Sequence, residues 1–143
     1  MRKRNYSVEE ANRTLPYVRT VVRELMDRYA RIQTLTRQHH DTPRAHAGKR
    51  ARLRALLQDE ATGLHACHEE LSAIGVELKD YELGLVDFPA QLEGRAILLC
   101  WKQGEEAVGH WHEVDAGYRA RNAVPDGEAC WPRAPTVAPA SPD

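Results

Sequence analysis

Aromatic residues are few in this sequence, and charge of neither sign prevails. Of the 143 residues 6% are aromatic, and 20 Lys or Arg stand against 21 Asp or Glu, which gives a formal net charge of −1. A protein that binds nucleic acid through a dominant basic face needs clustered cations in excess. The balance therefore predicts no nucleic-acid partner and leaves room only for a small local basic patch.

Cysteine is also scarce, and long hydrophobic runs are missing. Cys67, Cys100 and Cys130 are odd in number and form no Cys-x-x-Cys pair, unlike the disulfide framework of a secreted protein. The longest apolar run, residues 96–101, is far shorter than the roughly 20 residues of a membrane span. The basic residues 1–4 lead into a polar segment instead of the apolar stretch of an export signal. We expect a cytoplasmic protein that makes no use of a membrane.

A first long helical pattern begins at Ser7. Ser7 and Glu10 have the spacing of a capping box, in which each side chain accepts a hydrogen bond from a backbone N–H at the start of a helix. Pro16 lacks an N–H and disfavours a helical residue before it, so either the helix kinks there or a one-turn helix ends at Thr14 and a new helix follows. We expect the second arrangement. Apolar residues recur in steps of three and four, as in a coiled-coil seam: Val8, Ala11, Leu15, Val18, Val22, Leu25, Tyr29 and Ile32.

A second helical pattern follows a break at residues 39–43. It begins near Gly48 and ends at Gly75, a residue that suits a helix C-cap. Two helices of similar length, joined by roughly ten residues, are predicted to form a long antiparallel hairpin over residues 1–75. The seam of this second helix consists of Leu53, Leu57, Glu60, Leu64, Cys67, Leu71 and Ile74.

Further apolar residues lie beside each seam, so the apolar face of each helix is wider than one partner helix can cover. They are Val21, Met26 and Leu35 in the first helix and Leu56 and Ala61 in the second. Either the C-terminal half of the chain or a second copy must pack there. We expect a homodimer formed through the hairpin.

The periodicity changes after Gly75. Short apolar or alternating runs, separated by turns that contain Gly and Asp, predict three or four strands in a small antiparallel β-meander over residues 76–121. The meander would pack on the end of the hairpin as one domain with residues 1–75, which makes the fold class α+β. Residues 122–143 are rich in Pro and Ala and are predicted to form a disordered tail, or one extended over the surface.

Several motifs of this sequence resemble a known bacterial family, DUF2203. The resemblance covers roughly residues 5–122 and implies a small bacterial protein, but it brings no established activity, cofactor or catalytic residue. The motifs are the segments 75–80 (Gly-Val-Glu-Leu-Lys-Asp), 84–90 (Gly-Leu-Val-Asp-Phe-Pro-Ala) and 99–101 (Leu-Cys-Trp), the pairs Gly104-Glu105, Trp111-His112 and Gly117-Tyr118, Arg121, and an opening Tyr-Ser-Val-Glu-Glu-Ala-Asn with Leu15-Pro16.

His110 and His112 are the sharpest candidate for chemistry. Residues two apart on a strand project from the same face, so the two imidazoles would lie side by side as a metal site requires. Glu105, Glu113 or Asp115 could add a carboxylate ligand. With a turn at residues 103–106, His110 would lie opposite Leu99 and His112 opposite Ile97, on an apolar face. The alternative is that one His is a hydrogen-bonded core residue and the other is exposed.

A second cluster, His65, His68 and Glu69, occupies one surface of the second helix. Because this helix leads into the meander, His68 could join His110 and His112 at a metal. The alternative is a solvated helix surface.

Glu60 occupies a seam position otherwise filled by Leu, where a carboxylate needs a partner such as Arg28. It could instead bind a metal or fix the pairing register. Asp80 and Asp87 flank predicted turns, where acids usually accept from backbone N–H groups, although either could act as a carboxylate ligand. Cys100 lies in an apolar run, where an inert thiol is expected.

Two further residues could contact a bound ligand. Arg121 could clamp an anion or form a structural salt bridge. Trp101 could line a ligand site or belong to the hydrophobic core.

Together these features predict a metal- or small-ligand-binding protein whose reaction the sequence does not specify. Its metal, zinc or iron, would be held by residues from the set His110, His112, Glu105, Asp115 and His68, with Arg121 and Trp101 beside a bound ligand. The alternative is a metal-free interaction module in which the helices dimerise or dock a partner.

Overall fold

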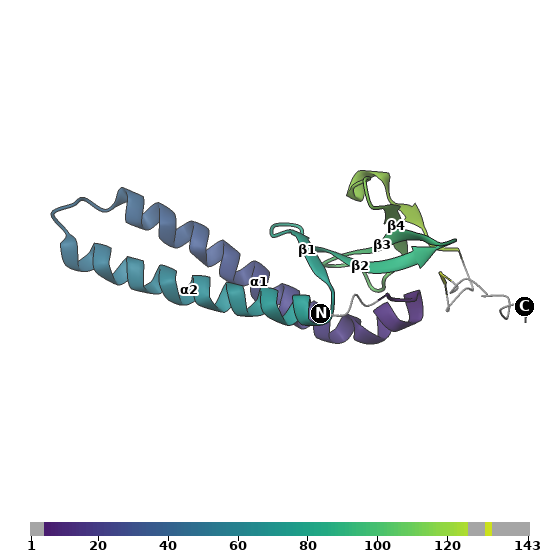
Figure 1. Cartoon of the computed structure of the whole chain (residues 1–143). Coiled ribbons are helices and arrows are strands. Elements are labelled where there is room, and N and C mark those ends of the chain that lie inside the picture. The colour runs from purple at the N-terminus through teal and green to yellow at the C-terminus, as the bar shows by residue number, and fades with distance from the viewer. Residues whose placement is uncertain (1–4, 126–130, 133–143) are drawn as a thin grey trace, which may run out of the picture.

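The computed structural model describes residues 5–125 and 131–132 and shows two long helices followed by an antiparallel sheet (Figure 1). Helix α1 spans Val8–Asp41, helix α2 spans Ala47–Ala73, and the two pack as a hairpin whose far half projects beyond the sheet. The predicted α+β fold, with a helical hairpin and then a β-meander, is confirmed. Much of the predicted Pro-rich tail, residues 126–130 and 133–143, lies outside the described residues.

Helix α1 begins as the sequence predicts and then continues through its proline. Ser7 is the N-cap, and the Ser7 hydroxyl and the Glu10 carboxylate each accept from the other residue's backbone N–H at 3.1 Å. The predicted break at Thr14 is wrong, because α1 runs unbroken past Pro16. Leu15 and Val18, on either side of the proline, are buried against the sheet, and this packing outweighs the lost hydrogen bond.

The connection between the helices is shorter than expected. Helix α1 extends through Asp41, so only residues 42–46 separate it from α2. Arg50 stabilises this connection, because its guanidinium donates to the backbone oxygens of His39 and Thr42 at 3.1 and 2.8 Å. At the other end, Gly75 follows α2 with φ of 78°, a conformation that favours glycine.

Glu60 pairs across the hairpin with two arginines of α1. Its carboxylate oxygens lie 3.0 Å from Arg28 Nη1 and 2.6 Å from Arg31 Nε. Gly63 permits this arrangement, because a Cβ there would lie only 2.2 Å from the Arg28 guanidinium carbon. Of the alternatives that the sequence leaves open for Glu60, pairing with Arg28 is the one that the structure shows.

Five strands form one sheet in chain order, whereas the sequence predicts three or four strands. A two-residue turn joins the second and third strands, and a short 3₁₀ helix, η1, precedes the fifth. The bounds are β1 Glu77–Asp80, β2 Leu85–Leu92, β3 Arg95–Lys102, β4 His110–Glu113, η1 Tyr118–Ala120 and β5 Asn122–Ala123.

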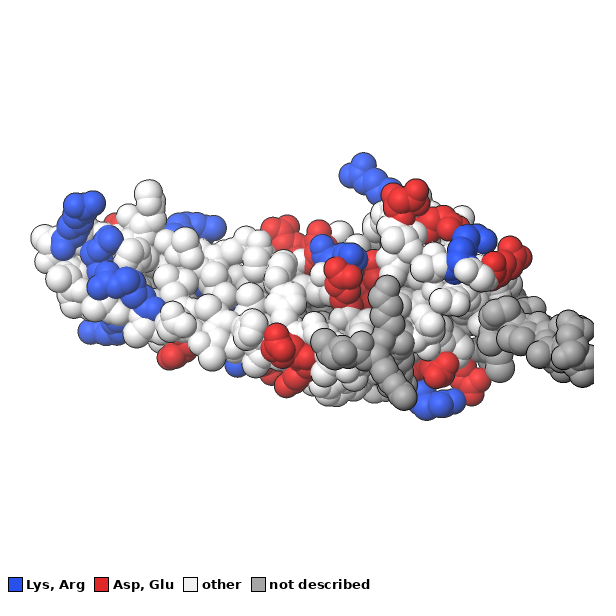
Figure 2. Space-filling view, viewed as in Figure 1, with Lys and Arg blue, Asp and Glu red and all other residues white. Residues whose placement is uncertain are grey.

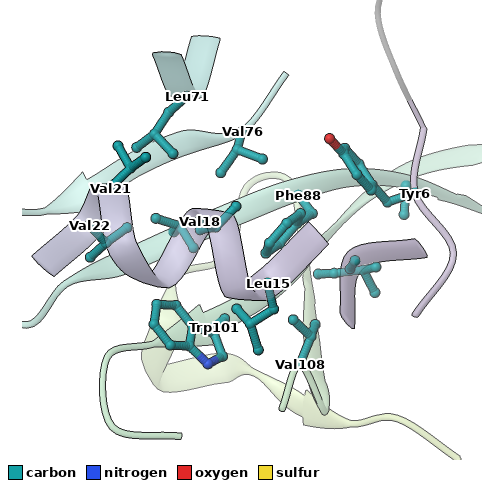
Figure 3. Close-up of a cluster of buried hydrophobic side chains, with 14 of the residues drawn as sticks. Tyr6, Leu15, Val18, Val21, Val22, Leu71, Val76, Phe88, Trp101 and Val108 are labelled. Carbon is teal, nitrogen blue, oxygen red and sulfur yellow. The ribbon is translucent and has the colours of Figure 1, made fainter. Parts of the chain in front are cut away.

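The two faces of this sheet have different chemistry. One face, called the core face, carries Phe88 and Trp101 and packs on the N-terminal part of α1 through Leu15 and Val18 (Figure 3). Side chains alternate along a strand, so Asp87 and Cys100 project from the opposite, outer face. The hairpin and the sheet thus share one hydrophobic core, while the outer face carries Asp87 and Cys100 together with apolar residues such as Leu85 and Leu98.

The register of β4 differs by one residue from the predicted one. His110 lies opposite Cys100 and His112 opposite Leu98, so both imidazoles belong to the outer face and not to an apolar face. The connection between β3 and β4 spans residues 103–109 and is longer than the predicted turn at 103–106. A contact from α1 holds this connection: the Asn12 side chain accepts from the Val108 backbone N–H at 2.7 Å and donates to its carbonyl at 3.2 Å. We attribute the register of β4 to this contact and to the longer connection.

The folded part continues past position 121. Strand β5 pairs with β4, inside the segment whose composition predicts a tail. Trp131 packs against Trp111 with ring centroids 5.6 Å apart, and its carbonyl accepts from the Val8 N–H at 2.6 Å. Within residues 5–125, neither helix combines the length and the apolar character that crossing a bilayer requires.

Candidate metal centre

Asp87 and Cys100 face each other across the central strand pair. The connecting turn has positive φ at both of its residues, 52° at Glu93 and 81° at Gly94, as a type I′ turn requires. This turn sets Leu92 opposite Arg95, and counting back along both strands then sets Asp87 opposite Cys100. Both side chains are almost fully buried.

His112 of β4 completes a compact group with these two residues. One ligand atom of each of Asp87, Cys100 and His112 lies within 4.8 Å of the other two. Their relative exposures are 2%, 0% and 3%, which is unusual for an acid and an imidazole. Three neighbouring strands therefore bring a carboxylate, a thiol and an imidazole together away from water.

The two ring nitrogens of His112 have different roles. Nδ1 lies 2.8 Å from the backbone carbonyl oxygen of Glu113. A carbonyl oxygen only accepts, so Nδ1 carries the hydrogen, and in the neutral ring Nε2 presents a lone pair. That lone pair lies 3.1 Å from Asp87 Oδ1. Either a proton or a metal ion between Nε2 and Oδ1 satisfies both atoms, and the Glu113 carbonyl is the outer partner that metal-binding histidines usually have.

Burial disfavours free charge on the other two members of the group. It raises the pKa of the Asp87 carboxyl above its ordinary value, although His112 acts in the opposite direction. Burial and the neighbouring Asp87 also raise the pKa of the Cys100 thiol to about 11. A divalent cation among the three groups would compensate for the charge that burial disfavours.

A small cavity of about 180 Å³ adjoins the cluster. Asp87 and His112 form part of its wall, so a small molecule inside it would lie next to two of the three candidate ligands. The remaining walls come from β1, β2, β3 and the segment after β4, namely Lys79, Leu85, Leu98, Val114, Ala116, Gly117 and Tyr118.

An ion pair lies beside the cluster, between the connection after β3 and the residue that follows η1. Arg121 binds Glu105 through two hydrogen bonds of 3.1 and 2.7 Å and stacks over the Tyr118 ring at 4.3 Å. Burial alone would raise the pKa of Glu105, but the Arg121 guanidinium and the Lys102 backbone N–H outweigh it and lower the pKa. His110 Nδ1 is 3.8 Å from Glu105, too far for a hydrogen bond, and has no partner among the described residues.

The predicted site residues are thus only partly brought together. His112 belongs to the cluster, whereas His110 and Glu105 are its neighbours. Asp115 is exposed, and Trp101 lies on the core face, where its ring nitrogen donates to the Glu105 carbonyl at 3.0 Å.

The helix histidines do not converge on this cluster. His68 bonds the Tyr81 hydroxyl at 2.5 Å, where α2 meets the turn after β1. His65 is 76% exposed and lies 3.5 Å from Glu69, as expected of a solvated helix surface.

Asp87 and Cys100 were not chosen as ligands by the sequence reasoning. The prediction that Asp80 accepts from turn N–H groups is confirmed at 2.8 Å, but the same expectation for Asp87 is wrong, because Asp87 lies within β2. The feature of the sequence that would have identified this pair is the two-residue turn between β2 and β3. Counting outward from Glu93-Gly94 places Asp87 opposite Cys100 without any other information.

A family model described as "Uncharacterized conserved protein (DUF2203)" matches residues 4–124. This range includes the hairpin, the sheet and all three residues of the Asp87–Cys100–His112 cluster. No curated protein and no solved structure matches the chain.

Proposed function

The chain belongs to the DUF2203 family, whose description states no activity, and we propose from the site geometry that it is a metal-binding protein. The ligands are Asp87 Oδ1, Cys100 Sγ and His112 Nε2, and zinc is the metal that this set suits best. Zinc accepts imidazole, thiolate and carboxylate together, and three protein ligands leave a fourth position for water or a small molecule.

The arrangement of His112 is the observation that carries this proposal. Its Nδ1 hydrogen is held by the Glu113 carbonyl, and its Nε2 faces the carboxylate oxygen Oδ1 of the buried Asp87 at 3.1 Å, so one cation between the two atoms would bind both. Two ligands of one zinc ion, each about 2.0–2.1 Å from it, lie at a similar separation. The cavity beside Asp87 and His112 supports the binding of a small molecule at the metal.

A thiolate ligand also supports a location for the protein. Cys67 and Cys100 are both free and buried, and Cys100 binds metal only when reduced. We therefore place the protein in the reducing cytoplasm.

Elemental analysis of protein purified without a His-tag tests the proposal. We expect close to one zinc per chain in the wild type and almost none in His112→Ala and Cys100→Ala. His110→Ala is the matched control, since it removes an imidazole from the same strand and face outside the cluster, and it should retain zinc. Wild-type protein that is metal-free and takes up no added zinc would contradict the proposal, and so would equal loss from His110→Ala.

An apolar groove on the hairpin supports a second candidate function, self-association of the chain. The groove has a volume of about 640 Å³, and the sheet does not cover Leu35 or Leu56, which is 44% exposed. A second hairpin packed there would bury both leucines. Light scattering should then show a dimer that Leu56→Glu converts to a monomer, and a monomeric wild type would exclude this function.

A further inference from the structure

The far end of the hairpin carries a strong local excess of positive charge. Between positions 37 and 54 there are six Lys or Arg and one acid, Asp41, whereas the rest of the chain has fourteen Lys or Arg against twenty Asp or Glu. Figure 2 shows blue side chains gathered at this end of the molecule. We call these six residues the basic tip: Arg37, Arg44, Lys49, Arg50, Arg52 and Arg54.

The cations of the basic tip are not neutralised by the rest of the protein. Five of them are exposed, and Arg50 is partly buried, where it binds backbone oxygens of the connection. Among the described residues, none of the six forms an ion pair. Several arginines elsewhere differ in this respect, because Arg28, Arg95 and Arg121 each have a carboxylate partner.

The surroundings add to the positive field at the tip. Helix α2 begins there without an acidic residue in its first turn, and its N-cap, His46, forms no side-chain cap hydrogen bond. No acidic side chain of α2 offsets the positive end of its dipole, although the negative end of the α1 dipole lies at the same tip. The field also contributes to the lowered pKa of His39, which is depressed by burial first and then by Arg50 and Arg54.

We propose that the basic tip binds the phosphate backbone of nucleic acid, without preference for sequence. Five of its six cations are arginines, whose planar guanidinium groups form paired hydrogen bonds with phosphate oxygens. Residues 37–54 contain no Phe, Tyr or Trp, the large aromatic side chains on which bases stack best, so contact with the phosphate backbone is the mode that these residues favour.

The shape and polarity of the tip favour this partner over a membrane. An α1 of 34 residues is about 50 Å long, and it carries the tip well away from the sheet (Figure 1). A helical surface that enters a lipid headgroup layer combines cations with exposed large apolar residues. The exposed large hydrophobic residues of the described chain, Tyr17, Leu56, Leu83 and Val114, all lie outside positions 37–54.

The near-neutral net charge, which predicts no nucleic-acid partner, averages two regions of opposite sign. That prediction excludes binding through a dominant basic face, but it allows a small local basic patch, and the basic tip is such a patch. Binding is an electrostatic contact near one end of the molecule, so local charge decides it more than the total does. The inference is independent of the metal centre.

Fluorescence anisotropy with a short labelled DNA duplex and a labelled RNA duplex tests the proposal in a salt series. Wild-type protein should bind both at about 50 mM salt and lose affinity as salt rises. The variant Lys49→Ala/Arg52→Ala/Arg54→Ala should bind at least about tenfold more weakly, and its log–log salt slope should fall by up to about 3, one for each phosphate contact removed. The matched control, Arg13→Ala/Arg23→Ala/Arg119→Ala, removes the same charge from exposed sites elsewhere and should retain the wild-type slope.

Three results would overturn the proposal. The first is absence of duplex binding at low salt, and the second is equal weakening by the tip and control variants. The third is a wild type that binds phosphatidylserine vesicles or polyglutamate more tightly than either duplex, which would assign the tip to a membrane or an acidic protein. Zinc content of the tip variant, measured in parallel, should equal that of the wild type.

Discussion

His112 is the residue on which the account of the site depends most. Its Nδ1 is fixed by the Glu113 carbonyl, and its Nε2 faces Asp87, so neither ring nitrogen is free to adapt. A buried acid and a buried imidazole together are costly without a proton or cation between them. Cys100, within 4.8 Å, adds a thiol to this group, and the thiol is our reason for proposing zinc as the metal.

At the residue scale, added zinc should stabilise the wild type but not Cys100→Ala. A ligand that binds only the folded state, at 100 times its dissociation constant, stabilises the fold by about 2.7 kcal/mol. For a domain of this size this corresponds to a rise in melting temperature of about 5–10 °C, measurable by thermal denaturation. Cys67→Ala is the matched control, because it removes a buried thiol remote from the cluster and should keep the full shift. A shift that persists in Cys100→Ala would remove this residue from the site.

At the scale of elements, the helices and strands follow from local pattern, but the register of β4 does not. The seam of α1 and the Ser7 capping box are visible in the sequence, as is the Glu93-Gly94 turn that pairs Asp87 with Cys100. The position of β4 depends instead on a contact between Asn12 and Val108, 96 residues apart. No local pattern contains that contact, so the side of the sheet that His112 occupies was predicted wrongly.

Replacement of Asn12 by Ala should therefore destabilise the protein and weaken zinc binding. It leaves the N–H and carbonyl of the buried Val108 without partners, at a cost of about 1–3 kcal/mol. Urea denaturation measures the first effect and zinc titration the second. Arg13→Ala, an exposed change on the next residue of α1, should alter neither. Unchanged zinc affinity in Asn12→Ala would show that β4 keeps its register without this contact.

The hairpin has its own testable element, the pairing of Glu60 with Arg31 and Arg28. A hydrogen bond from Arg31 lowers the pKa of Glu60, so the stabilisation is full above the ordinary glutamate pKa of about 4.3 and is lost as pH falls through the lowered value. Glu60→Gln should cost about 1 kcal/mol at neutral pH, and the difference should shrink towards about pH 3. Urea denaturation at both pH values checks this, with Glu69→Gln as an exposed control. A difference that does not change in acid would exclude the ion pair as its cause.

At the scale of the whole molecule, the two proposed binding sites lie at opposite ends. The sheet end holds the Asp87–Cys100–His112 cluster and its cavity. The far end of the hairpin, which projects away from the sheet (Figure 1), holds the basic tip (Figure 2). The shared core between α1 and the sheet fixes the cluster, whereas the tip lies beyond that core. Binding at one end therefore need not disturb the other.

X-ray absorption spectroscopy at the zinc edge of the zinc-loaded wild type tests the metal site most directly. The account predicts one sulfur at about 2.3 Å and nitrogen or oxygen ligands at about 2.0–2.1 Å, with the sulfur shell lost in Cys100→Ala. A zinc shell made only of nitrogen and oxygen, or protein that holds no zinc after loading, would contradict it.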